Sequence, residues 1–145
     1  MIEGLGDLGY TPAADELFKL RGTDYDAEVT RALNKLVPER LTKELLASAK
    51  NRELDSYLQE RAMVTFGTIS ATNCARSLVP LLDDVTPIVY PRPLSGQEWR
   101  ICDRAAVTIA LVLGWEQPIM LRYVRPEQRE DLMKRVRTWA TEPQP

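Results

Sequence analysis

With 145 residues, of which 44% are hydrophobic, the chain is long enough and apolar enough to bury the core of one globular domain. Its 19 Lys and Arg residues against 21 Asp and Glu residues give a formal charge of −2, which removes the overall basic field that non-specific nucleic-acid binding needs. The sequence contains no histidine, which excludes serine–histidine and cysteine–histidine nucleophile pairs and histidine metal ligands. We therefore expect a binding protein without metal or cofactor, not an enzyme.

Apolar residues recur at intervals of three and four along most of the chain, which is the spacing of one face of an α-helix. The predicted helices, in chain order, are 1–8, 12–20, 26–37, 38–50, 54–69, 73–82, 97–114 and 126–141. Pro12 and Pro38 stand at or near a first helical position, and Gly22 and Asn51 mark turns. Only Ile88–Tyr90 has the composition of a strand, and prolines flank it. The sequence therefore predicts an all-α fold.

Four equivalent positions recur along the chain, with spacings of 28, 33 and 44 residues: Leu8, Leu36, Ile69 and Leu113. A leucine lies nine residues beyond each of the first three, at Leu17, Leu45 and Leu78. A small or aliphatic residue lies seven residues before each of the last three, at Val29, Ala62 and Ala106. Such periods are typical of stacked helical pairs, so we expect the six residues that flank the four equivalent positions to be buried where helices pack closely.

This pattern resembles HEAT repeats, in particular the bacterial phycobilisome-lyase HEAT-like type. The residues that carry the resemblance are Leu5-Gly6-x-Leu8-Gly9 with Ala13-Ala14-x-x-Leu17, and Arg104-Ala105-Ala106-Val107 leading to Leu113-Gly114. The resemblance covers most of residues 1–125, although Val37 and Ser70 stand where the family pattern has glycine. It implies one domain over residues 1–145: a right-handed α-α superhelix, or short HEAT/ARM-type solenoid, of about three to four helical pairs.

The start of the chain allows two interpretations. Residues 1–8 can form only the last turns of a second helix whose partner is missing, whereas a solenoid normally begins with a capping unit. Either the chain is a piece of a longer protein whose further HEAT repeats pack against it, or residues 1–8 form a short capping helix.

The last predicted helix, 126–141, is strongly amphipathic and is expected to cap the solenoid by covering Val107 and Leu111. Its apolar face is made of Leu132, Met133, Val136, Trp139 and Ala140. Its basic residues are Arg129, Lys134, Arg135 and Arg137. They form either a phosphate-binding patch or a solvated face with Glu130–Lys134 and Asp131–Arg135 ion pairs, and the i,i+4 spacing favours the second interpretation.

Other residues with reactive side chains have structural interpretations. Cys74 and Cys102 lie far apart in predicted helices without the spacing of a zinc site, which predicts buried, reduced thiols. Asp83 and Asp84 are adjacent, so they point in different directions and are expected to act as a helix cap and a solvent contact.

Two features indicate the compartment. The longest apolar run, 105–114, is too short to cross a bilayer, and the first residues lack the basic start and apolar stretch of a secretory signal. These features predict a cytoplasmic protein that does not bind membranes.

The most distinctive segment is a Pro-rich inserted loop at 86–97, which makes the last repeat about a dozen residues longer than the others. Its prolines stiffen the loop and reduce the entropy lost on docking, and Tyr90 and Arg92 are residue types common at interface hot spots. The alternative is that Ile88, Val89 and Tyr90 fold back to cover the core.

A second cluster opens the last long helix of the repeats, with Trp99, Arg100, Asp103 and Arg104. Second helices of a solenoid line its concave surface, so this cluster is expected to form a small polar pocket with Gln59 and Arg61. The alternatives are an ion-pair network between repeats and, for Trp99, a position in the core. The candidate partner-binding residues are therefore Tyr90, Arg92, Trp99, Arg100, Asp103, Arg104, Gln59 and Arg61.

Three functions follow from this fold. The first is a scaffold that binds another protein through its concave face and its Pro-rich loop. The second, implied by the resemblance, is a bilin lyase that binds an open-chain tetrapyrrole. The third is a DNA-binding HEAT protein, against which the interspersed Asp and Glu residues argue.

Overall fold

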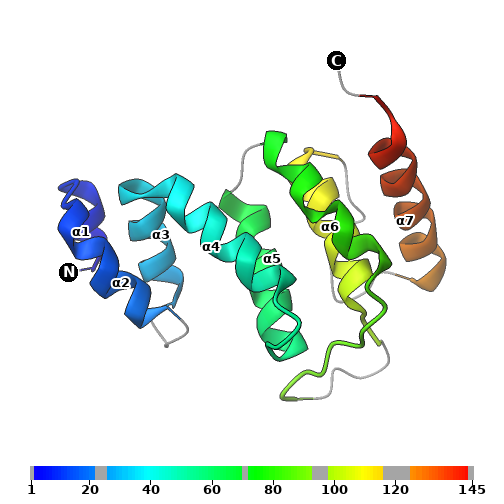
Figure 1. Cartoon of the computed structure of the whole chain (residues 1–145), viewed down its shortest axis with the longest axis horizontal. Helices are drawn as coiled ribbons and strands as arrows, with labels where there is room; N and C mark the ends of the chain where they lie inside the picture. Colours follow the sequence, from blue (N-terminus) through cyan, green and yellow to red (C-terminus); the bar gives the residue numbers. More distant parts are fainter. Residues whose placement is uncertain (1, 22–25, 70–71, 93–97, 116–124, 144–145) are drawn as a thin grey trace. The chain divides into compact units, whose positions relative to one another are not determined.

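The computed structural model describes residues 2–21, 26–69, 72–92, 98–115 and 125–143, and every regular element in them is a helix (Figure 1). In chain order these are α1 (Ile2–Asp7), η1 (Thr11–Ala13), α2 (Ala14–Leu20), α3 (Asp26–Leu36), α4 (Pro38–Lys50), α5 (Ser56–Ile69), η2 (Thr72–Asp83), α6 (Ile101–Val112) and α7 (Pro126–Thr141). The all-α prediction is confirmed. Among these helices, none combines the length and the apolar character that crossing a bilayer requires.

Two elements differ from their predicted form. The predicted helix 73–82 is a 3₁₀ helix, η2, with Pro80 inside it; proline has no N–H to donate and disfavours an uninterrupted α-helix. The last long helix of the repeats begins at Ile101 and not at residue 97, because Glu98 and Trp99 are not helical.

The chain forms two compact units, Met1–Glu44 and Leu45–Pro145. In the first unit, α1 and α2 both pack on α3. Gly6 makes the α1–α3 contact close, since a Cβ at this position would lie 3.1 Å from the Cα of Ala32. On the surface of this unit, the Arg40 guanidinium lies 4.4 Å from the Phe18 ring centroid and pairs with Asp15 at 2.6 Å.

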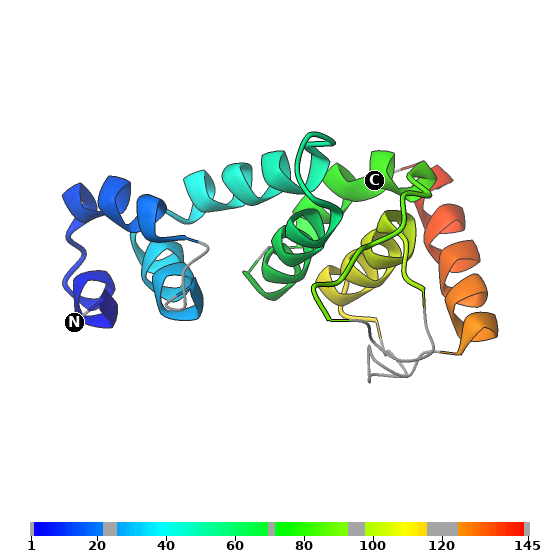
Figure 2. The same cartoon turned by 90° about the horizontal axis from the view of Figure 1, so that it is seen from below.

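In the second unit, α6 is the central element. It contacts α5, η2 and α7 (Figure 2), and all residues from Ile101 to Ala110 are buried. Large side chains that fill the space around it include Met63 and Phe66 of α5 and Leu78 of η2, each with 0% of its surface exposed. A helix surrounded on three sides cannot have one polar face, which explains why α6 is the most uniformly apolar segment of the sequence.

Residues that recur in the sequence have similar surroundings in the structure. All six positions predicted to be buried are between 0% and 8% exposed: Leu17, Leu45, Leu78, Val29, Ala62 and Ala106. The four equivalent positions Leu8, Leu36, Ile69 and Leu113 all stand at, or one residue beyond, the end of a helix: α1, α3, α5 and α6.

The ends of α1 and α6 also share one local geometry. Gly9 and Gly114 follow these helices with φ of 64° and 69°, the left-handed conformation that glycine adopts without a Cβ penalty. At both ends the next residue donates its N–H to a carbonyl five positions earlier, from Tyr10 to Leu5 (3.3 Å) and from Trp115 to Ala110 (3.0 Å). This is the Schellman arrangement of helix termination, so the Leu-Gly pairs of the sequence act as helix stops.

Helix α7 covers only part of the surface that it was predicted to cover. Val136 of α7 is fully buried, and Val107 of α6 is 2% exposed. Leu111 remains 39% exposed, because its side chain lies on the side of α6 near Gly67 of α5, where a Cβ on that glycine would be 3.8 Å away. The prediction that α7 covers Leu111 is therefore wrong.

Two arginines join α7 to η2 at their opposite ends. Arg76 of η2 donates to the carbonyls of Trp139 (3.4 Å) and Glu142 (2.8 Å) at the end of α7. In return, Arg137 of α7 donates to the Leu82 carbonyl (2.7 Å) at the end of η2. Terminal carbonyls of a helix have no partner within the helix, so each arginine satisfies groups of the other element and favours antiparallel packing.

The charged side of α7 also differs from its prediction. Among the ion pairs of the described residues, none joins Glu130 to Lys134 or Asp131 to Arg135. Arg135 lies 4.9 Å from the centroid of the Trp115 ring instead. The arginines of α7 therefore bond mainly to other elements, and the predicted face with i,i+4 pairs is not formed.

Candidate functional site

The candidate site begins with an extended segment between η2 and α6, residues 84–92, which we call the Pro-rich segment. Helix α6 needs it, because the first N–H groups of a helix have no partner within the helix. The carbonyls of Asp84 and Thr86 accept these hydrogen bonds, from Cys102 (2.8 Å) and Ile101 (3.0 Å). Residues 93–97, the rest of the predicted loop, lie outside the described residues.

The Asp84 carboxylate has a structural role that the sequence analysis missed. It is 5% exposed, accepts the Thr86 N–H at 3.0 Å and lies 3.6 Å from the Arg52 guanidinium. Of the two adjacent aspartates, predicted as a cap and a solvent contact, Asp84 is therefore the buried one. Its neighbour Asp83 is exposed and pairs with Arg137 at 2.9 Å.

The Pro-rich segment presents one apolar side to solvent. Ile88 is 7% exposed and donates its N–H to the Trp99 carbonyl at 2.7 Å, beside a single antiparallel bridge between Pro87 and Arg100. Val85 and Val89, on the alternate side, are 65% and 69% exposed. Folding back onto the core thus accounts for Ile88 but not for Val89. We call the exposed row Val85, Pro87 and Val89 the apolar ridge.

Tyr90, near the C-terminal end of the segment, is attached to a buried ion pair. Glu60 of α5 and Arg104 of α6 pair with side chains only 7% and 8% exposed. The Tyr90 hydroxyl donates to the same Glu60 oxygen, Oε1, at 2.9 Å, and its ring meets Tyr57 edge to face at 6.0 Å. Burial, together with the negative charge of Glu60, raises the pKa of Tyr90 to about 12.

This pKa predicts an alkaline loss of stability. The folded protein holds the Tyr90 proton more tightly than the unfolded chain, whose tyrosine has the ordinary pKa of 10.0. The corresponding stabilisation is therefore complete below pH 10 and is lost as the pH rises toward 12. We expect the free energy of unfolding, measured with urea, to fall over this interval, and to fall less in Tyr90→Phe. Tyr10→Phe, which changes an exposed tyrosine, should retain the wild-type profile; an unchanged profile in Tyr90→Phe would contradict the prediction.

Trp99 joins the Pro-rich segment to α7. It is 2% exposed, and the guanidinium groups of Arg104 of α6 and Arg129 of α7 both lie over its ring, 4.8 Å and 5.1 Å from the centroid. Cations on the faces of a buried indole stabilise it through the ring quadrupole. Trp99 is thus part of the core and not an exposed anchor.

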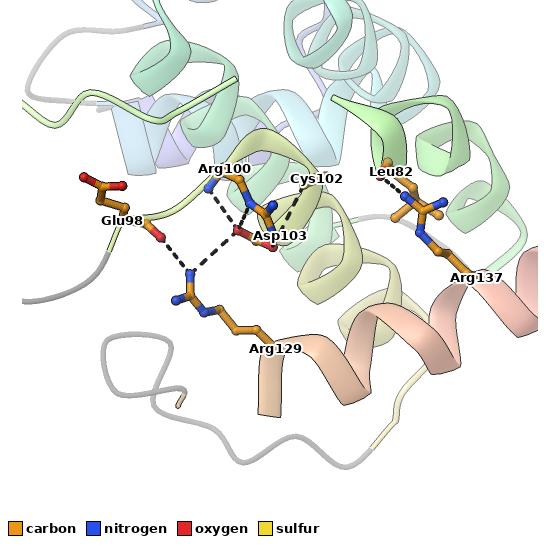
Figure 3. A network of polar contacts seen from close by, with 7 residues as sticks. All are labelled: Leu82, Glu98, Arg100, Cys102, Asp103, Arg129 and Arg137. Carbon is orange, nitrogen blue, oxygen red and sulfur yellow. Dashed lines mark hydrogen bonds and ion pairs between the residues drawn. The ribbon is translucent and has the colours of Figure 1, made fainter. Parts of the chain in front are cut away.

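Asp103 organises the polar network drawn in Figure 3. Its carboxylate is 3% exposed and accepts two hydrogen bonds from the Arg100 guanidinium, at 2.8 and 2.9 Å, and one from the Arg100 backbone N–H at 3.1 Å. Arg129 approaches the same carboxylate at 3.7 Å and donates to the Glu98 carbonyl at 2.7 Å. The carboxylate of Asp103 raises the pKa of Arg100, so this guanidinium stays charged. Burial raises the pKa of the Cys102 thiol, which keeps it protonated and unreactive.

A groove of about 810 Å³ lies between this network and α7. The ridge residues Val85 and Pro87 and Met133 of α7 form its apolar lining. Its basic side chains are Arg100, Arg129, Lys134 and Arg137, and its acidic side chains are Glu98, Asp103 and Glu130. Basic and acidic side chains are nearly equal in number, so the groove is not a dedicated phosphate site.

The predicted partner-binding residues are only partly brought together. Arg100 and Asp103 line the groove. Tyr90 and Arg104 both contact the Glu60 carboxylate. Trp99 is buried, with Arg104 over its ring. Arg92 is exposed at the end of the Pro-rich segment.

The other two predicted residues have different surroundings. Gln59 is 3% exposed and donates to the Asn51 carbonyl at 2.6 Å, so it completes a turn and does not open onto a polar pocket. Arg61 is half-buried on α5. Glu60 and Arg129 connect the network. Glu60 was not among the predicted residues, and Arg129 was predicted to lie in a phosphate-binding patch or on a solvated face.

Comparisons with protein-family models, with curated proteins and with solved structures find no match. Within the part of the chain that the structure describes, no three Cys, Asp or Glu side chains gather as a metal site would require. The arrangement offers an apolar ridge, a charged groove and a rigid polar support, which are the elements of a binding surface.

Proposed function

We propose that the chain is a protein-binding scaffold. In this proposal its helical pairs form a right-handed α-α superhelix of about three to four HEAT-like units, with α7 as the capping helix. It binds another protein through the concave face lined by its second helices and through the Pro-rich segment. The recurrence of buried positions and the shared helix stops at Gly9 and Gly114 support a repeat architecture.

The apolar ridge is the observation that carries the proposal. Val85 and Val89 expose 65% and 69% of their surface, although the backbone beside them is fixed by hydrogen bonds to α6 and to Trp99. Burying each valine against a partner is worth about 1–2 kcal/mol. Since the segment is already ordered, little of this gain is lost to conformational entropy.

The backbone of the segment indicates how a partner is recognised. Pro87 has no N–H, and the Val89 N–H already donates to Ser56 Oγ at 3.0 Å. A partner therefore cannot extend the segment by adding a β-strand along this stretch, since the donors it needs are missing or occupied. Recognition through side chains of the ridge follows.

A position-specific cross-link tests this proposal. A photoreactive phenylalanine analogue at Val89 is expected to give one defined protein adduct in an extract of the source cells. The same analogue at Ala47, exposed on α4, is the control and should not give that adduct. Unlabelled wild-type chain should compete for the adduct, and the Val85→Ser/Val89→Ser variant should compete at least tenfold less well. Equal adducts from both positions, or none from Val89, would refute the scaffold function.

Tetrapyrrole binding is the second candidate. The groove volume of about 810 Å³ falls within the range of small-molecule sites, and its arginines suit the carboxylates of a bilin. Titration of an open-chain tetrapyrrole should then shift its visible absorbance band, and a constant spectrum would exclude this function. DNA binding has less support, since three acidic side chains share the groove with four basic ones.

A further inference from the structure

Helix α7 and the Pro-rich segment are attached to two adjacent carbonyls. Arg129 of α7 donates to the Glu98 carbonyl at 2.7 Å, and Ile88 of the segment donates to the Trp99 carbonyl at 2.7 Å. Residues 98 and 99 are therefore held from both sides. Loss of one attachment frees the backbone that makes the other.

A second connection runs through side chains. Arg129 and Arg104 both lie over the Trp99 ring. Arg104 also pairs with Glu60, which accepts a hydrogen bond from the Tyr90 hydroxyl. Ile88 is thus bonded to Trp99 itself, and Tyr90 is connected to Trp99 through Glu60 and Arg104. Arg129 is the member of this set that belongs to α7.

We infer that α7 is a clamp that orders the Pro-rich segment, with Arg129 as its positioning residue. Docked α7 fixes Glu98 and Trp99 in the extended conformation that pairs with Ile88, and so holds the apolar ridge in place. A consequence, which rests on the proposed function, is that the ridge binds its partner well only while α7 is docked. A ligand that fills the groove and draws Arg129 away would weaken binding at the ridge.

Hydrogen exchange of the Ile88 amide, followed by NMR on the full chain without any partner, tests the clamp. In Arg129→Ala we expect this amide to exchange about tenfold faster, the effect of losing a charge-assisted hydrogen bond. Arg135→Ala is the matched control on the same helix, because Arg135 contacts Trp115 and not residues 98–99. It should leave Ile88 exchange within twofold of wild type, and the Ile109 amide in α6 should keep its protection in both variants.

Two results would overturn the inference: unchanged Ile88 exchange in Arg129→Ala, or an equal rise in both variants, which would mean that α7 acts only through general stability. If Arg129→Ala also loosens α6, Arg129→Met decides the matter, since methionine keeps an unbranched apolar stem but cannot donate a hydrogen bond to the Glu98 carbonyl. Faster Ile88 exchange in this variant supports the clamp, and wild-type exchange refutes it. The measurement needs no partner, so a failure of the scaffold function would leave its result standing.

Discussion

Replacement of Glu60 by alanine is expected to lower the free energy of unfolding by about 3–5 kcal/mol, because it leaves a buried guanidinium without its counter-charge. Arg104 is 8% exposed on its side chain, and its Nε is buried without a hydrogen-bond partner among the described residues. The Tyr90 hydroxyl loses its acceptor in the same variant. Urea unfolding followed by far-UV circular dichroism measures the loss.

The double variant Glu60→Met/Arg104→Met separates the charge effect from packing. A buried ion pair contributes little net stability over apolar side chains of similar volume, so the double variant should recover most of what Glu60→Ala loses. Glu53→Ala removes an exposed carboxylate just before α5 and should change stability by less than about 0.5 kcal/mol. A cost below 1 kcal/mol for Glu60→Ala would show that Arg104 reaches water or another partner easily, contrary to the structure.

Local spacing was sufficient to predict most helices of this chain. The predicted 38–50 matches α4 (Pro38–Lys50), because proline favours the first turn and the apolar period continues to Ala49. The start of α6 was predicted four residues too early, since Trp99 and Arg100 pair with Ile88 and Pro87, about a dozen residues away, and not with their own helix. Intervals of three and four also do not separate an α-helix from a 3₁₀ helix, and η2 was therefore not recognised as one.

The network around the site was harder to predict, because its contacts are long-range. The Tyr90–Glu60 bond spans 30 residues, and the bond from Arg129 to the Glu98 carbonyl spans 31. Residue type predicts that Glu60 and Arg129 are charged, but not that one is buried and the other stacks on an indole. For Arg135 the i,i+4 rule was misleading, since its guanidinium lies over the Trp115 ring and not beside Asp131. A core position for Trp99 was one of two predicted alternatives, because a large apolar side chain favours burial.

Replacement of Asp103 by alanine is expected to cost about 2–4 kcal/mol. This sums the lost hydrogen bond from the N-cap N–H of Arg100 to the N3 side chain and the lost charge-assisted hydrogen bonds from the Arg100 guanidinium. Asp103→Asn should cost about half as much, because an amide oxygen still accepts the Arg100 N–H at the start of α6 but carries no charge. Thermal unfolding of both variants measures the order of these effects. Asp131→Ala is the control, since it removes an exposed carboxylate from α7.

Salt dependence distinguishes this buried carboxylate from a surface ion pair. The Asp103 side chain is 3% exposed, so mobile ions do not reach it. The difference in stability between wild type and Asp103→Ala should therefore persist in 1 M NaCl, where the Debye length is about 3 Å. An exposed pair such as Lys19–Glu16 would be screened under the same conditions. If salt removed most of the stability difference caused by Asp103→Ala, the carboxylate would have to be open to solvent. The groove would then lack the rigid support on which both the scaffold function and the α7 clamp depend.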